Sequence, residues 1–110
     1  MRINELLENK NLKLLSENVD TSVEIEGVFV GDLLSWVMGN SEPKQAWITV
    51  QAHNNVIAVA GLREFSCVIV CHGAEINNAV IAQATTEGIP LLSTDLSAFD
   101  TCRTLIEMGL

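Results

Sequence analysis

Cys67-Val68-Ile69-Val70-Cys71 is an unbroken apolar run in the second half of this chain. A pleated strand points successive side chains to opposite faces, so a strand formed by this run has no polar face. Strands of that kind occur where helices cover both faces of a parallel sheet. The run therefore predicts an α/β fold with a largely parallel central sheet and helices on both sides.

Two further apolar runs, 47–50 and 91–92, have the same relation to the sequence around them. Each run ends at a polar or glycine-containing turn that leads into helix-like sequence. We expect helices over 56–64, over a segment around Val80 that Gly88 ends, and from Ser97 onward. This strand and helix order calls for right-handed crossovers between parallel neighbours.

The amino-terminal half predicts smaller elements. Apolar spacing indicates a short helix over 2–8, and alternation indicates an edge strand at 12–14 and a strand with one wet face at 23–26. Asp32 is a good N-cap for a helix of about two turns, and Gly39-Asn40 would give that helix a left-handed end.

Helix caps and stripes are also readable in the second half. Asn54 or Asn55 could cap the helix over 56–64, and Ser97 followed by Asp100 resembles a capping box. The buried stripe of the last helix is predicted at Phe99, Cys102, Leu105 and Ile106.

Length and charge exclude several classes of function. The 110 residues fit one domain, 1–110, and the formal charge of −8 opposes binding to phosphate backbones and anionic membranes. The six basic residues form no cluster in the sequence, so we expect no nucleic-acid partner. The amino terminus is charged throughout and no stretch reaches about 18 apolar residues, which predicts a cytoplasmic protein without membrane contact.

The three cysteines are expected to be free. Cys67 and Cys71 lie four residues apart on one predicted strand, about 13 Å apart on the same face, and cannot bridge each other. We interpret them and Cys102 as small apolar side chains of the core.

The carboxyl ends of the predicted strands are where a ligand would bind, because loops and free helix amides converge there in open α/β sheets. A small anionic metabolite or a segment of another protein would suit such a polar rim. Solvated turns with capping roles are the alternative interpretation. The candidate ligand-binding residues are His53, Asn54, His72, Gly73, Ser93 and Thr94.

The sequence gives little support to a metal site or to a catalytic cysteine. A metal site from Cys71, His72 and Asp95 with His53 lacks the paired spacing that places two ligands on one centre. Adjacent residues of a strand face opposite ways, so Cys71 and His72 are poorly placed as nucleophile and base. We expect no catalytic residues, no metal and no cofactor.

Trp36 lies near the edge of its helix stripe, where it would be half exposed. It could anchor a self-interface, or it could cover the edge of its own core.

Four segments carry a resemblance to a known family: 31–38, 47–53, 55–60 and 88–94. Over nearly its full length the chain resembles the DRTGG domain family, an α/β module also related to the amino-terminal domain of HPr kinase/phosphorylase. It looks most like the small stand-alone members of anaerobic bacteria. The pentapeptide that names the family is absent, and Glu26-Gly27 stands where its end is expected.

The resemblance implies a regulatory or assembly module without chemistry of its own, because such domains accompany catalytic domains such as phosphotransacetylase or CBS-containing pyrophosphatase. Kinase activity is not implied. We expect a non-catalytic cytoplasmic module that acts through contact with a protein partner as a homodimer. The alternative is a metabolite or nucleotide sensor at the carboxyl edge of the sheet, and an enzyme using Cys71 is a third hypothesis.

Overall fold

The central apolar run forms strand β4 (Cys67–Val70) in the middle of a five-stranded sheet, in a computed structural model that describes residues 1–110. Strands β3 (Ala46–Thr49) and β5 (Leu91–Ser93) flank β4 in parallel, and β2 (Val28–Val30) pairs in parallel with β3. β1 (Lys13–Leu14) pairs antiparallel with β5, which gives the order β1-β5-β4-β3-β2. The predicted largely parallel sheet with a short edge strand is confirmed.

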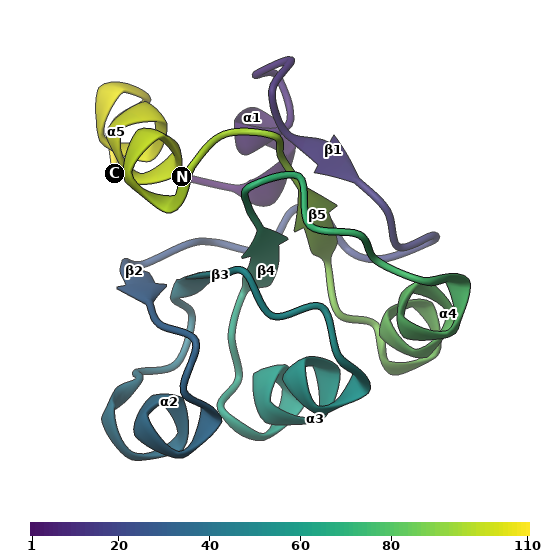
Figure 1. Cartoon of the computed structure of the whole chain (residues 1–110). Helices are drawn as coiled ribbons and strands as arrows, with labels where there is room; N and C mark the ends of the chain where they lie inside the picture. Colours follow the sequence, from purple (N-terminus) through teal and green to yellow (C-terminus); the bar gives the residue numbers. More distant parts are fainter.

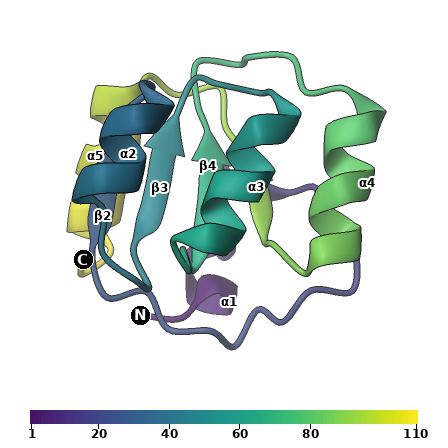
Figure 2. The same ribbon diagram turned by 90° about the horizontal axis from the view of Figure 1, so that it is seen from below.

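Helices lie on both faces of this sheet, as the apolar strands require. On one face lie α2 (Leu34–Asn40), α3 (Asn54–Leu62) and α4 (Asn78–Glu87), and on the other lie α1 (Ile3–Leu6) and α5 (Ala98–Glu107) (Figures 1 and 2). Helices α2, α3 and α4 each connect one parallel strand to its neighbour, so all three lie on the same face.

The two faces hold separate cores. Trp47, Val68 and Leu91 belong to a cluster of 13 buried residues beneath α2, α3 and α4. The residues that follow them in their strands, Ile48, Ile69 and Leu92, belong to a cluster of 11 beneath α1 and α5. Because successive residues enter different cores, both faces of the sheet are buried.

The strand predicted at 23–26 is wrong. Only one isolated bridge, from Arg2 to Glu24, forms there, and the sheet begins at Val28 instead. The backbone of this segment is engaged elsewhere, because the Ile25 N–H donates to the Met1 carbonyl at 2.7 Å. The alternation therefore comes from a segment that crosses the end of the core, with Ile25 inserted into it.

Both predicted ends of α2 are also wrong. Leu33 is the N-cap residue, and the Asp32 carboxylate instead accepts hydrogen bonds from Thr49 Oγ1 at 2.7 Å and Val50 N at 2.8 Å. The other end has no left-handed residue, because Gly39-Asn40 is helical and Ser41 is extended. The Arg63 guanidinium donates to Ser41 Oγ at 3.0 Å and also to its carbonyl, which fixes this end of the helix.

The cap of α3 differs from the prediction and the cap of α5 agrees with it. His53, rather than Asn54 or Asn55, caps α3, its Nδ1 accepting from Asn55 N at 3.1 Å. Ser97 caps α5 as predicted, accepting from Asp100 N at 3.0 Å.

The predicted stripe of α5 is only partly correct. Leu105 is buried, but Phe99 and Ile106 are exposed, and Thr101 is buried instead. The Thr101 hydroxyl donates to the Ser97 carbonyl at 2.7 Å, so this polar side chain enters the core with its hydrogen bond satisfied. A threonine therefore takes the place that the apolar pattern gave to a phenylalanine.

Candidate functional site

The six predicted rim residues all lie near the carboxyl ends of β3, β4 and β5, but they face three directions. His53 and Asn54 begin α3, and Asn54 Nδ2 donates to Gln83 Oε1 of α4. The His72 imidazole reaches the opposite face of the sheet, where its Nε2 accepts from Ala98 N at the start of α5, at 3.1 Å. Ser93 and Thr94 lie beside β1. The structure thus divides the rim into separate surfaces.

The turn after β4 positions the imidazole through unusual backbone conformations. His72 and Gly73 both have φ of 63°, a left-handed region that non-glycine residues seldom occupy. A Cβ on Gly73 would lie 3.1 Å from Asp95 Oδ1, so this position also needs the small residue for space. Their N–H groups donate to the Leu96 and Thr94 carbonyls, at 2.7 and 3.0 Å, and tie the turn to the loop before α5.

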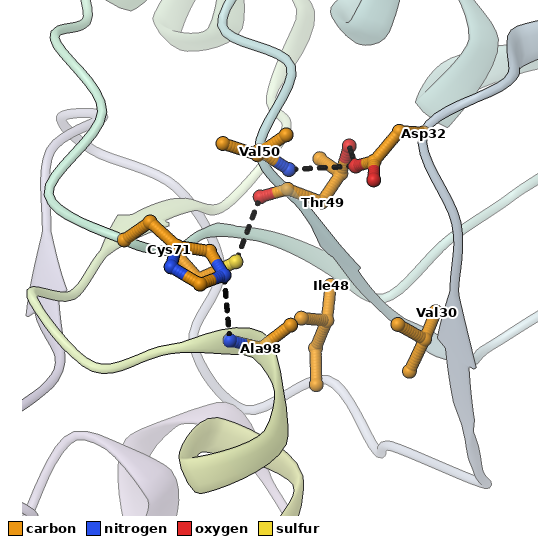
Figure 3. A pocket seen from close by; sticks show the side chains of 8 residues that line it. Val30, Asp32, Ile48, Thr49, Val50, Cys71 and Ala98 are labelled. Atoms are coloured by element: carbon orange, nitrogen blue, oxygen red, sulfur yellow. Dashed lines mark hydrogen bonds between the residues drawn. The ribbon is translucent and has the colours of Figure 1, made fainter.

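A cavity of about 210 Å³ opens beside His72, between β2, β3, β4 and the start of α5 (Figure 3). Its lining is mostly apolar and includes Asp32, whose carboxylate holds the end of β3 through Thr49 and Val50. The sequence pattern does not indicate Asp32 as a strand-end residue, because the alternation predicts the preceding strand at 23–26. The lining residues are Val30, Asp32, Ile48, Thr49, Val50, Cys71, His72 and Ala98.

The Cys71 thiol in this cavity is kept protonated. Burial raises the pKa of Cys71, and the nearby Asp32 carboxylate and Cys102 thiol raise it further. Its Sγ–H donates to the Thr49 carbonyl at 3.4 Å. A nucleophilic cysteine needs the opposite shift in pKa, so these surroundings do not favour the hypothesis of an enzyme using Cys71.

A second pocket, of about 290 Å³, is lined only by polar residues and is called the lysine pocket below. Antiparallel pairing of β1 with β5 places Lys13 beside Ser93, and this brings Lys10 and Lys13 to the same opening. Neither lysine forms an ion pair, whereas Lys44 pairs with a carboxylate. The lining residues are Lys10, Asn11, Lys13, Ser93, Thr94 and Asp95.

Ser93 and Thr94 are among the predicted rim residues, whereas the two lysines are not. The basic residues are dispersed along the chain, and only the pairing of a two-residue edge strand brings these two together. The pattern at 12–14 was the available signal, since an edge strand there needed a partner.

Five large apolar side chains are exposed along the side of the molecule where β2 forms the edge of the sheet. They come from β2, from the start and middle of α2, and from α5, and Figure 1 shows α2 and α5 on either side of β2 at that edge. We call this set the β2-edge face: Val30, Leu33, Trp36, Phe99 and Ile106, each between 51% and 70% exposed. Trp36, at 61%, is more exposed than a residue that covers its own core.

No group of three or more His, Cys, Asp and Glu side chains is arranged to hold a metal ion. None of the helices is long and apolar enough to cross a bilayer.

Comparison with known proteins identifies a solved structure that shares this fold and a family whose profile matches the sequence. The CBS and DRTGG domains of the regulatory region of Clostridium perfringens pyrophosphatase, crystallised with the activator diadenosine tetraphosphate, match with a TM-score of 0.76. The match covers 96% of this chain and 46% of that chain at 15% identity, so it shows a shared fold and this chain spans less than half of that region. No curated protein sequence matches the chain. The DRTGG domain profile matches residues 5–108, nearly the whole sequence, and the chain therefore belongs to the DRTGG domain family.

Proposed function

We propose that residues 1–110 act as one non-catalytic regulatory domain that works through protein contact and forms a homodimer. The observation that carries this proposal is the β2-edge face, where five large apolar side chains remain in water. The regulatory region of the Clostridium perfringens pyrophosphatase, which shares the fold, supports a regulatory role.

The size of this face suits an interface. From typical side-chain areas, its five residues expose on the order of 500 Å² of apolar surface. That is near the upper end for the largest apolar patch on a monomer, roughly 300–600 Å². It would supply much of the roughly 800 Å² that each partner contributes to a standard interface.

The three thiols support action in the cytoplasm. Cys67, Cys71 and Cys102 are all free. Unpaired cysteines are typical of reducing compartments, where disulfides seldom persist.

Light scattering coupled to size-exclusion chromatography tests the dimer at tens of micromolar protein. We expect about twice the 12.0 kDa of one chain. Phe99→Glu should give the monomer mass, because it buries a charge in the interface. Leu62→Glu is the matched control, since Leu62 is equally exposed, at 70%, but lies on α3 away from β2. A wild-type mass of one chain, or equal dissociation by both variants, would contradict the proposal.

A second candidate function, sensing of a small anionic metabolite or nucleotide, is favoured by the lysine pocket. Lys10 and Lys13 are unpaired cations in a chain of net charge −8, and Asn11, Ser93 and Thr94 offer hydrogen-bond donors beside them. Phosphate oxygens accept hydrogen bonds from such groups. The pyrophosphatase regulatory region was crystallised with a polyanionic nucleotide, which agrees with this class of ligand.

A thermal-shift screen with ATP, pyrophosphate, acetyl phosphate and citrate tests this second function. A ligand at a hundredfold excess over its Kd should stabilise the fold by about 2.7 kcal/mol. Lys10→Gln with Lys13→Gln should abolish the shift, whereas Lys44→Gln, which removes a paired lysine, should leave it. His53→Ala and His72→Ala test the rest of the predicted rim. If no compound moves the midpoint, the sensor hypothesis is wrong.

A further inference from the structure

The outer side of β2 is an open sheet edge. On its inner side the Gly27 carbonyl accepts from Ala46 N at 2.8 Å, and Gly31 N donates to the Ile48 carbonyl at 3.2 Å. Backbone groups alternate in direction along a strand, so Phe29 also faces β3 while Val28 and Val30 point their N–H and C=O groups outward. Such unpaired groups are a template for another strand.

On one face of the sheet, the apolar side chains near this edge come from α5. The side of α5 that carries them is set by the rotation of the helix about its own axis. Phe99 and Ile106 are seven residues apart, almost two full turns, and so lie on one side of the helix. Met108 is nine residues from Phe99, half a turn away, and its Sδ accepts from Asn9 Nδ2, at 3.9 Å. That side faces the amino-terminal segment, so Phe99 and Ile106, half a turn away, face away from that segment. Figure 1 shows α1 on one side of α5 and β2 on another.

On the other face, α2 supplies the border. Leu33 and Trp36 are three residues apart, which places them on neighbouring positions of the helix surface. Both are more than half exposed, and α2 connects β2 to β3 directly. Figures 1 and 2 show α2 and α5 near β2 on opposite faces of the sheet, so the open edge lies between two helices that carry exposed apolar residues.

Two carboxylates at this edge pair with cations, which matters because two copies of a chain of charge −8 repel each other. Glu26, just before β2, pairs with Lys44 at 3.6 Å. On α5, Asp100 pairs with Arg103 at 3.3 Å, and the Arg103 guanidinium lies 4.8 Å from the centre of the Phe99 ring. Asp32, past the other end of β2, forms no ion pair, but its carboxylate accepts hydrogen bonds from Thr49 Oγ1 and Val50 N.

We propose that β2 pairs antiparallel with β2 of a second copy. The two-fold axis that relates the copies passes midway between their Phe29 residues. This rests on the proposed homodimer and specifies its geometry. Val28 then lies opposite Val30 of the second copy, and Val30 opposite Val28, so the outward groups of both residues exchange four hydrogen bonds. The two five-stranded sheets become one continuous sheet. The occupant is a second copy because the outward groups are symmetric about Phe29 and therefore complement themselves.

The same axis brings like helices together. A two-fold axis perpendicular to the sheet keeps each face on its own side, so α5 lies beside α5 of the second copy and α2 beside α2. The apolar residues of the β2-edge face are then buried on both sides of the joined sheet. This is how strand pairing and apolar burial act at one interface.

Cysteine cross-linking of mixed variants tests the register. Val28→Cys and Val30→Cys are made separately in a Cys102→Ser background, mixed, and oxidised mildly. Residues opposite each other lie about 5.5 Å apart between Cα atoms, within reach of a disulfide. Two copies of residue 28, or of residue 30, lie roughly 8 Å apart, which is too far to bridge. We expect a cross-linked dimer from the mixture, at least tenfold more than from either variant alone.

The outcomes separate this proposal from the dimer itself. A dimer mass by light scattering without a cross-link in the mixture, or with an equal cross-link in Val30→Cys alone, would overturn the register and leave the homodimer standing. A monomer mass would overturn both.

Amide hydrogen exchange on the unmodified chain gives a check that needs no variant to fold. No partner within the chain protects the outward N–H of Val30, so its exchange should slow at least tenfold between dilute and concentrated protein. Equal exchange at both concentrations, where the mass shows a dimer, would refute pairing through β2.

Discussion

Replacing Leu91 or Leu92 by alanine tests whether both faces of the sheet are dry. The two residues follow each other in β5 and are both fully buried, but Leu91 packs beneath α3 and α4, and Leu92 beneath α1 and α5. A sheet with one wet face would make one of the two substitutions harmless. The structure predicts that neither is.

The magnitude follows from what each substitution removes. Three buried carbon atoms lose about 2.4 kcal/mol of transfer free energy. The cavity that remains adds to this, and fully buried Leu→Ala changes usually reduce the free energy of unfolding by about 3–5 kcal/mol. Against a total of about 5–15 kcal/mol, each variant should be clearly destabilised but still folded.

Urea unfolding followed by circular dichroism, at one fixed protein concentration, measures the effect. With an m-value of about 1–3 kcal/mol/M, each midpoint should fall by at least about 1 M. Leu62→Ala is the control, because the same atoms are removed from an exposed site on α3 and the change should stay within about 0.5 kcal/mol. If either buried variant matched this control, the covering of that face would be wrong.

Four further predictions concern the backbone and the titrating groups. Gly39→Ala should stabilise the chain by about 0.5–1 kcal/mol, because Gly39 lies inside α2 with open space at its Cβ. Gly88→Ala should instead destabilise the chain by about 1 kcal/mol, because Gly88 has φ of 70° and alanine is strained in that conformation. Urea midpoints of both variants measure the two changes. A change in stability of the same sign for both would contradict the assignment of Gly88 as the left-handed end of α4. Burial raises the pKa of the Cys67 thiol from 9.0 to about 12, so the folded state keeps a proton that the unfolded state loses. Stability should therefore fall as pH rises from about 9 toward 12, by up to about 1.4 kcal/mol per pH unit, and Cys67→Ala should remove that part of the loss; identical pH profiles would show that the thiol is not buried. Hydrogen bonds from the amino-terminal ammonium of Met1, and then from Arg2, lower the pKa of Glu24, so acetylation of Met1 should raise it. A carbon-detected NMR titration measures that shift, and an unchanged Glu24 curve would exclude the ion pair.

The central sheet could be predicted because its signal is local and strong. Val68, Ile69 and Val70 have no polar neighbour within the strand, and only a strand buried on both faces accommodates such a run. The helix ends at Gly88 and Ser97 were also predictable, since both depend on residues within one turn of the cap.

Elements whose place depends on distant residues could not be predicted. Asp32 has the sequence context of an N-cap, but its carboxylate binds Thr49 and Val50, 17 and 18 residues away. In α5 the apolar spacing of Phe99 and Ile106 is as regular as that of Leu105, and only the sheet decides which side is buried. Local pattern carries no information about that choice.

The candidate site shows the same division. That His72 lies at a strand end follows from the sequence, but the face it reaches depends on its hydrogen bond to the start of α5. Lys10 and Lys13 converge with Ser93 only because a two-residue strand pairs in one register with β5. Strand ends could thus be located, while the directions of their side chains required the tertiary structure.

The short strand β1 limits how far this molecule can assemble. It occupies the far edge of the sheet with only two residues, of which Lys13 carries a charge into solvent, and brief charged edges discourage further strand addition. Another strand can therefore be added to the sheet at β2 but not at β1. When two copies pair at β2 about a two-fold axis, both outer edges of the joined sheet are formed by β1. The assembly is then a closed dimer and does not extend into a filament.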